Sequence, residues 1–256
     1  MDLGLSGRVA LVAAATSGLG LGIARELAAE GAIVSVAGRS PDRLAAAVEE
    51  LKAVSPTGTV GGVSLDVRDE EAVRAWADDV AAEHGRLDVV VTNAGGPGSG
   101  VASSHGVADY RAALELSLLS AVSLVSAGLP HLRRNGYGRV LFVTSQSVKQ
   151  PIEGLALSNT VRPGLLGYAK SLVQEVSAEG ITVNVLAPGM TRTPELEAWA
   201  STLPDGLAGL ASDIPVGRVG ETAELGALAA FLASPRAAFI TGAVIPIDGG
   251  ASRGLL

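Results

Sequence analysis

Ser145, Ser158 and Arg162 are the residues whose types and spacing suggest a chemical site. Ser158 and Arg162 stand four residues apart in a helical pattern, so their side chains share one face of a helix. Ser145 ends a buried-looking strand over residues 139–145 and can point at the same place. A serine hydroxyl normally acts with an adjacent base, and a protonated arginine orients and polarises but accepts no proton. The three residues therefore predict an active site with an unusual supply of protons.

The elements that must position these side chains alternate along the chain. Apolar runs without strict polar alternation predict parallel strands at residues 9–13, 33–37, 60–65, 88–92, 140–145, 181–186 and 243–247. Apolar residues at helical spacing lie between them, at residues 21–30, 43–53, 70–83 and 164–179. Gly31, Gly85 and Gly180 stand where helices should end. We predict an α/β fold in one domain over residues 1–256: a Rossmann-like, doubly wound parallel sheet of about seven strands with helices on both faces.

The first strand–helix junction, residues 12–22, contains Gly18 and Gly20. Glycines here let the backbone approach a pyrophosphate, which then binds the amide-rich N-terminus of the next helix. The same glycines also permit tight helix–strand packing without a ligand. Later strands end near Asp66, near residues 93–95 and at Pro188 with Gly189. Because ligands bind at the carboxyl ends of strands in open α/β sheets, these positions favour a nucleotide site.

The composition of the 256-residue chain excludes several classes of function. The absence of cysteine excludes disulfides, thiol catalysis and thiolate metal sites, and we predict no metal site. A formal net charge of −7 argues against nucleic acid or an anionic membrane surface as a partner. The N-terminus lacks a basic start followed by an apolar run, and no apolar stretch reads as long enough to span a bilayer. We expect a cytoplasmic protein.

Taken together, these motifs resemble those of the short-chain dehydrogenase/reductase family, in a layout similar to bacterial 3-oxoacyl-carrier-protein reductases. The resemblance covers nearly the whole chain. It rests on the Gly-rich turn, on residues 93–95, on Val183-Asn184 before Pro188-Gly189, and on a tail with residues 239–242 and 248–250. It implies a nicotinamide cofactor, a carbonyl or alcohol substrate and a homotetramer.

The resemblance also implies which residues hold the cofactor. They are Ala14, Thr16, Ser17, Gly18, Leu19 and Gly20 for the pyrophosphate, Asp66 and Val67 for the adenine, Asn93, Ala94 and Gly95 for the adenine ribose region, and Pro188, Gly189, Thr191 and Thr193 for the nicotinamide amide or the nearby phosphate. Ala14 stands where the family has its first glycine. If that position needs a positive φ, alanine costs roughly 1 kcal/mol or more, whereas at an ordinary φ the change is nearly free.

The end of the second predicted strand bears on the choice between NADP(H) and NAD(H). NAD-selective members carry an acidic residue there, which binds the ribose hydroxyls. This chain has Gly38, followed by Arg39 and Ser40. A guanidinium suits a 2′-phosphate, so the sequence favours NADP(H). The alternative is that Arg39 is a solvated residue at a helix start.

The family's reductases use a serine, a tyrosine and a lysine, supported by an asparagine. By position these are Ser145, Ser158, Arg162 and Ser117, so only the serine is retained and the phenolic proton donor is replaced. Pro163 removes a backbone donor and disfavours α geometry at Arg162, which predicts a kink or a late helix start.

Three functions remain open from the sequence. The first is an NADP(H)-dependent oxidoreductase with an atypical proton-transfer site. The second follows halohydrin dehalogenases, which resemble this family, have an arginine in the lysine position and bind no nucleotide; Arg162 fits them, but Ser158 does not replace their tyrosine. The third is a nucleotide-binding protein without turnover. Lys149 and His105 are candidate substitutes near the substrate, and an apolar stripe over residues 194–215 predicts a small, partly apolar substrate.

Overall fold

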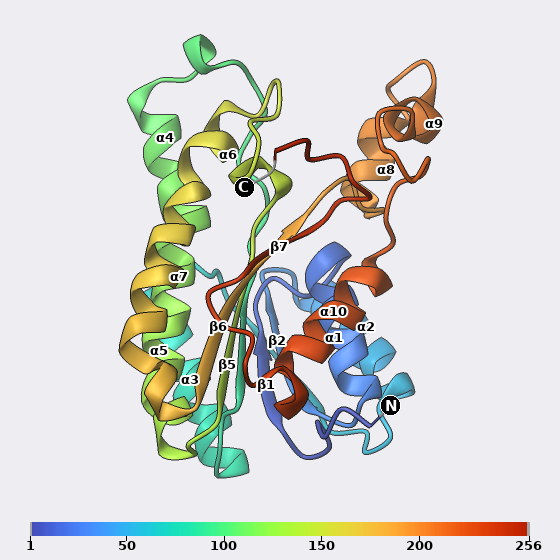
Figure 1. Cartoon of the computed structure of the whole chain (residues 1–256). Coiled ribbons are helices and arrows are strands. Elements are labelled where there is room, and N and C mark those ends of the chain that lie inside the picture. The colour runs from blue at the N-terminus through green and yellow to red at the C-terminus, as the bar shows by residue number, and fades with distance from the viewer. Residues whose placement is uncertain (1, 255–256) are drawn as a thin grey trace.

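A sheet of parallel strands forms the middle layer of the computed structural model, which describes residues 2–254 (Figure 1). Its strands are β1 (Val9–Val12), β2 (Ile33–Gly38), β3 (Val60–Ser64), β4 (Val89–Thr92), β5 (Gly138–Val143), β6 (Ile181–Pro188) and β7 (Val244–Ile247). The seven strands run in the order β3-β2-β1-β4-β5-β6-β7, and every pairing is parallel. The predicted fold class is confirmed. The strand order reverses between β1 and β4, and this is where ligands bind in doubly wound sheets.

Helices cover both faces of the sheet (Figure 1). One layer contains α3 (Glu70–His84), α5 (Ser120–Arg134) and α7 (Pro163–Val176). The other contains α1 (Gly18–Ala29), α2 (Pro41–Val54) and α10 (Thr222–Ala233). Shorter helices lie toward the carboxyl edge of the sheet: α4 (Val107–Leu114), α6 (Ala156–Val161), α8 (Pro194–Ala200) and α9 (Gly206–Ala211).

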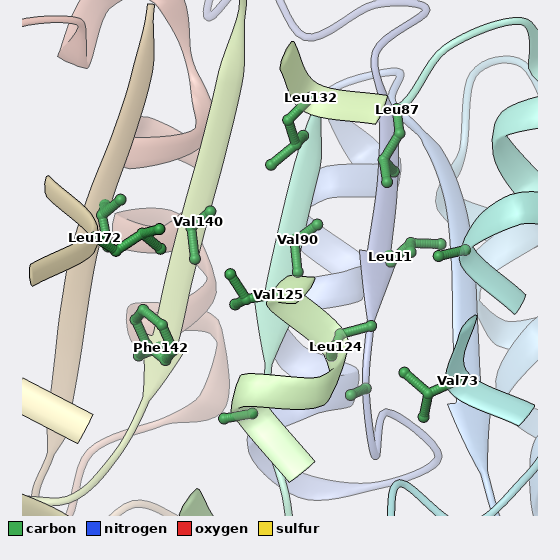
Figure 2. Close-up of a cluster of buried hydrophobic side chains, with 14 of the residues drawn as sticks. Leu11, Val73, Leu87, Val90, Leu124, Val125, Leu132, Val140, Phe142 and Leu172 are labelled. Atoms are coloured by element: carbon green, nitrogen blue, oxygen red, sulfur yellow. The ribbon is translucent and has the colours of Figure 1, made fainter. Parts of the chain in front are cut away.

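Two hydrophobic cores explain why the strands lack polar alternation. In β1, Val9 and Leu11 pack into the core under α3 and α5, whereas Ala10 and Val12 pack into the core under α1 and α10. Figure 2 shows the first of these cores, where Leu124 and Val125 of α5 face the sheet. Because both faces of β1 are buried, this strand forms a continuous apolar run, whereas the edge strand β3 is largely exposed.

The predicted helix ends are confirmed at three glycines. Gly31, Gly85 and Gly180 have φ values of 84°, 69° and 78°, which are left-handed conformations that glycine adopts without the penalty of a Cβ. Each of these glycines lies just before or close to a strand, so the chain turns from the helix layer back into the sheet at these points.

One helix in the described part of the chain is long and apolar enough to cross a bilayer by length and composition alone, a test that a buried core helix also passes. Residues 107–134 form one helix of 28 residues with a mean hydropathy of 1.7 over its most apolar window. Within this helix, α4 and α5 are joined by a π-helical turn, Glu115–Leu119. Leu124 and Val125 of this helix are buried in the core beside β4 and β5 (Figure 2).

Candidate active site

The turn after β1 lies at the point where the strand order reverses, and its backbone is strained. Ala14 has a φ of 47° and is the only non-glycine residue with a positive φ in the described part of the chain. Its carbonyl oxygen accepts a hydrogen bond from Asn93 Nδ2 at 3.1 Å, which joins the ends of β1 and β4. The position therefore needs the conformation that glycine adopts freely, and alanine costs roughly 1 kcal/mol there.

The glycines of this turn bring α1 close to the sheet. A Cβ on Gly20 would lie 2.6 Å from the Ala14 carbonyl oxygen and 2.9 Å from the Ala15 Cα, so only glycine fits. Gly18 has a φ of 58°, and a Cβ there would lie 3.3 Å from the Thr193 methyl carbon. Ser17 precedes α1, but its side chain caps no amide of that helix. The first-turn N–H groups are therefore suited to an anionic ligand.

The ends of β2 and β3 place Arg39 and Asp66 at the same edge. Arg39 is exposed and forms no salt bridge with the residues that the structure describes, and Ser40 caps α2 by accepting from the Arg43 N–H. Asp66 pairs with Arg68, which lowers the pKa of the Asp66 carboxyl to about 2; Arg39 acts in the same direction. The edge therefore carries a free guanidinium beside a carboxylate that stays ionised.

The remaining predicted cofactor residues follow the carboxyl ends of β1, β3, β4 and β6 or end β6 itself. Gly189 donates its N–H to the Ile247 carbonyl oxygen at 2.9 Å, and a Cβ on Gly189 would lie 2.8 Å from Gln146 Oε1. Thr191 donates its hydroxyl to the Gly189 carbonyl oxygen at 3.1 Å. Val67, Asn93 and Ala94 line a narrow internal cavity behind the strand ends. Pro188 is the last, buried residue of β6, and Gly95 and Leu19 flank the same edge.

Ser145 and Ser158 are linked through a third serine. The Ser145 hydroxyl oxygen accepts a hydrogen bond from the Ser147 N–H at 3.1 Å. The Ser147 and Ser158 hydroxyl oxygens are 3.1 Å apart, and both side chains are buried. The Ser158 hydroxyl is thus paired within the protein. Because the serine side chain is short, this hydroxyl stays where α6 meets the turn after β5.

Arg162 and Ser117 line the same internal cavity as Asn93. Arg162 donates a hydrogen bond from Nη1 to the Thr144 carbonyl oxygen, next to Ser145. Its Nε and the Ser117 Oγ are buried and have no hydrogen-bond partner among the described protein atoms. Burial lowers the pKa of Arg162 and the charge of Glu195 acts against this, but a guanidinium remains protonated throughout the physiological range. This side of the site offers a cation and hydroxyls.

The backbone around Pro163 confirms the predicted helix start, because α6 ends at Val161 and α7 begins at Pro163, but it differs from the prediction at Arg162. Arg162 adopts φ −64° and ψ −32°, an α geometry that the following proline should disfavour, so that expectation is wrong. Pro163 is the first residue of α7, where a missing N–H leaves no gap in the hydrogen bonding. The Arg162 N–H still bonds to the Ser158 carbonyl oxygen at 3.1 Å, so α6 and α7 follow each other closely and keep Ser158 and Arg162 one turn apart.

The sequence analysis did not single out Ser147, although its position two residues after Ser145 in a serine-rich turn was a signal. Lys149 is half-buried at the end of that turn, with no side-chain hydrogen bond or ion pair in the described part of the chain. His105 packs edge-on against Tyr110, with ring centroids 6.3 Å apart, and its Nε2 is buried. Neither residue is shown to touch the Ser158 hydroxyl.

Comparison with known proteins identifies the family of this arrangement. The family model described as enoyl-(acyl carrier protein) reductase matches residues 13–252. The 3-oxoacyl-[acyl-carrier-protein] reductase of Escherichia coli is 32% identical over 248 residues, covering 97% of this chain and 98% of that protein.

Solved structures agree with the sequence relatives. The L-sorbose reductase of Gluconobacter frateurii, in complex with NADPH and L-sorbose, superposes with a TM-score of 0.93 at 31% identity and full coverage of both chains. An actinorhodin polyketide ketoreductase variant with NADPH gives a TM-score of 0.89 at 29% identity, covering 96% of this chain and 98% of that one. With its strained Gly-rich turn, its parallel sheet and these relatives, the chain belongs to the short-chain dehydrogenase/reductase family.

Proposed function

We propose that this protein is an NADP(H)-dependent oxidoreductase that acts on a carbonyl or alcohol substrate through an atypical proton-transfer site. The observation that carries the proposal is the nucleotide edge: the first turn of α1 lies behind a glycine turn that tolerates no Cβ at Gly20. A pyrophosphate fits such a helix N-terminus, where amide donors converge. When bound, the nicotinamide would supply or accept the hydride.

The choice of NADP(H) is supported by the end of β2. Gly38 provides no carboxylate for the ribose hydroxyls, and the exposed guanidinium of Arg39 suits a 2′-phosphate. Both solved structures described above carry NADPH in their names, which agrees with this choice. In this proposal Asp66 and Val67 contact the adenine, and Asn93, Ala94 and Gly95 lie along the ribose.

Two groups of side chains would orient the substrate and move its proton. Ser145 would donate a hydrogen bond to the substrate oxygen, and Arg162 would hold the nicotinamide ribose with its cationic head. Ser158 is paired with Ser147, so a proton would pass along these hydroxyls or through water rather than from one acidic side chain. A serine hydroxyl is a much weaker acid than a phenol near pKa 10, so turnover by this route is expected to be slow.

Equilibrium titration with NADPH and NADH tests the first step. The chain has two tryptophans, so quenching of their fluorescence, or calorimetry, gives both dissociation constants without any need for turnover. We expect NADPH to bind at least about tenfold more tightly than NADH, which corresponds to about 1.4 kcal/mol. Tighter binding of NADH would overturn the cofactor assignment, and the absence of binding by either nucleotide would overturn the proposed function.

A non-catalytic nucleotide-binding role is the second candidate, and the burial and pairing of Ser158 with Ser147 favour it. Hydride transfer across a panel of aldehydes, ketones and ketoesters separates the two candidates. If the protein binds NADPH but transfers no hydride to any of them, the non-catalytic role is supported. A dehalogenase-like reaction would instead require turnover of halohydrins without a nucleotide.

The other parts of the proposal concern partners. We propose a small, partly apolar substrate, because α8, whose sequence includes Leu196 and Trp199, lies toward the carboxyl edge of the sheet (Figure 1). We also propose a homotetramer in the cytoplasm, with neither nucleic acid nor a membrane as a partner. Light scattering coupled to size-exclusion chromatography would measure the number of subunits.

A further inference from the structure

We propose that Thr16 is a specificity-determining residue: its side chain fills the space that an acidic residue at position 38 would need, and this excludes the NAD-type recognition of the ribose. The inference rests on the proposed function and deepens it. In that proposal Gly38 matters only because it has no carboxylate. Here Gly38 packs against Thr16, which lies on the nucleotide turn between β1 and α1.

The pair is defined by close distances. Gly38 is the buried last residue of β2, and a Cβ built there would lie 2.3 Å from the Thr16 methyl carbon, 3.1 Å from the Thr16 hydroxyl oxygen and 3.3 Å from the Thr16 Cβ. Carbon atoms that are not bonded approach to about 3.5–4.0 Å at their optimum. Even an alanine at position 38 would therefore collide with Thr16, before any carboxylate is added.

A change of rotamer at Thr16 relieves the closest contact but still leaves contacts of 3.1–3.3 Å that require the turn to shift. The three staggered orientations about χ1 exchange the methyl, the hydroxyl and the hydrogen among the same three places. The most favourable orientation points the hydrogen on the Thr16 Cβ toward position 38. One other Thr16 atom then still lies about 3.1 Å from a Cβ at position 38, and the Thr16 Cβ lies 3.3 Å from it. A carboxylate at position 38 extends beyond Cβ and needs still more room.

The turn that carries Thr16 cannot withdraw without cost. The Ala15 N–H donates to the Ala37 carbonyl oxygen at 3.0 Å, which ties the turn to β2 directly beside the pair. Asn93 Nδ2 holds the Ala14 carbonyl oxygen on the opposite side. Moving Thr16 away from Gly38 would break at least the first of these buried bonds, and an unpaired buried group costs about 1–3 kcal/mol.

Electrostatics, like packing, disfavours a carboxylate at position 38. A carboxylate at position 38 would stand next to Arg39 and would neutralise the guanidinium that is free to meet a 2′-phosphate. The Thr16 hydroxyl occupies the same region and can donate a hydrogen bond to a phosphate, whereas an ionised carboxylate only accepts. Thr16 and Gly38 together therefore favour a phosphorylated ribose.

A double-mutant cycle in the full-length protein tests the inference. The variants are Gly38→Asp, Thr16→Ala and the two combined, and the readouts are the dissociation constants of NADPH and NADH with the thermal midpoint of each apo protein. We expect Gly38→Asp alone to lose at least about tenfold in NADPH affinity, to gain no NADH affinity and to melt several degrees lower. Adding Thr16→Ala should restore the midpoint and raise NADH affinity at least about tenfold over the single variant.

Two further variants separate packing from charge. Gly61→Asp on β3 adds the same carboxylate where a Cβ would meet nothing within 4 Å, so it should leave both affinities and the midpoint unchanged. Thr16→Ser removes the methyl but keeps a hydroxyl, so in combination with Gly38→Asp it should rescue less than Thr16→Ala. The inference is overturned if Gly38→Asp alone gains as much NADH affinity as the double variant. If the wild type binds neither nucleotide, the proposed function itself has failed.

Discussion

At the turn between β1 and α1, the groups that would meet a pyrophosphate are backbone N–H groups, whereas between β5 and α7 the groups that would move a proton are side chains. The first region tolerates a change of residue: Ala14 replaces a glycine, yet its carbonyl still bonds to Asn93 and the turn keeps its shape. The second region also keeps its backbone, since Ser158 and Arg162 remain one helical turn apart.

The difference between the two regions lies in what a preserved backbone can do. Amides bind anions whatever side chain they carry, so a nucleotide turn survives substitution at the cost of some strain. Proton transfer depends on the pKa and the reach of one side chain, and Ser158 has neither the acidity nor the length of a tyrosine. Binding and turnover can therefore diverge within one fold, and the variants below test where they do.

The largest expected effect comes from Ser158→Tyr combined with Arg162→Lys. If the proton donor is the only missing part, kcat/KM for carbonyl reduction with NADPH should rise by about 100-fold or more, because a positioned general acid contributes roughly that much. Initial rates over a carbonyl panel measure the change. Arg162→Lys alone, and Arg162→Lys with Ser171→Tyr on the exposed part of α7, are the controls and should show no rise. A double variant that binds NADPH but stays inactive would show that the site differs in more than its acid.

Gly20→Ala should damage the nucleotide turn most. The added Cβ would lie 2.6 Å from the Ala14 carbonyl oxygen and 2.7 Å from Asn93 Nδ2, so it would break the bond between them. We expect the free energy of unfolding to fall by about 1–3 kcal/mol, as in other overpacked sites, with a loss of NADPH affinity. Chemical denaturation and titration measure both. Gly61→Ala, where the Cβ meets nothing within 4 Å, should change neither, and equal losses in the two variants would contradict the steric explanation.

Ala14→Gly should raise the stability of the protein, whereas Gly20→Ala lowers it. It relieves the positive φ of 47° and should raise the free energy of unfolding by up to about 1 kcal/mol, without weakening NADPH binding. Ala15→Gly, at a neighbour with an ordinary φ, adds chain entropy without relieving strain and should be destabilising. Denaturant midpoints of the two variants check the prediction. A loss of stability in Ala14→Gly would mean that the side chain contributes more than its conformation costs.

The smallest effect concerns pH. The Arg68 guanidinium lowers the pKa of Asp66 to about 2, so the folded protein holds this carboxylate ionised more strongly than the unfolded chain, whose value is about 3.9. The stabilisation is present in full above the unfolded value and is lost as the pH falls from about 4 through about 2. The difference in stability between wild type and Asp66→Asn should shrink over that range, as measured by denaturation at several pH values. A constant difference would show that the ion pair contributes nothing.

Much of the architecture could be read from the sequence, because strands buried on both faces leave continuous apolar runs such as residues 9–12. Residues near the strand ends could be placed at one edge for the same reason. The pairing of Ser147 with Ser158 could not be predicted, since it depends on where a turn and a helix meet in space. The geometry of Arg162 was mispredicted because packing on α6 and α7 overrides the local preference of a residue before proline. The left-handed Ala14 was only a conditional expectation, since φ is not encoded by residue type alone.

The π-helical turn at Glu115–Leu119 has a consequence for how this chain could diverge. The Ser120 N–H bonds to the Glu115 carbonyl oxygen, so the turn holds one more residue than an α-helical turn would. Removing a single residue from this segment would convert it into a regular helix without rotating α5 against the sheet. The helix layer would keep its packing, while Ser117 would no longer be presented to the cavity beside Arg162. A one-residue deletion here is therefore a route by which descendants could lose one site residue while the fold around it remains intact.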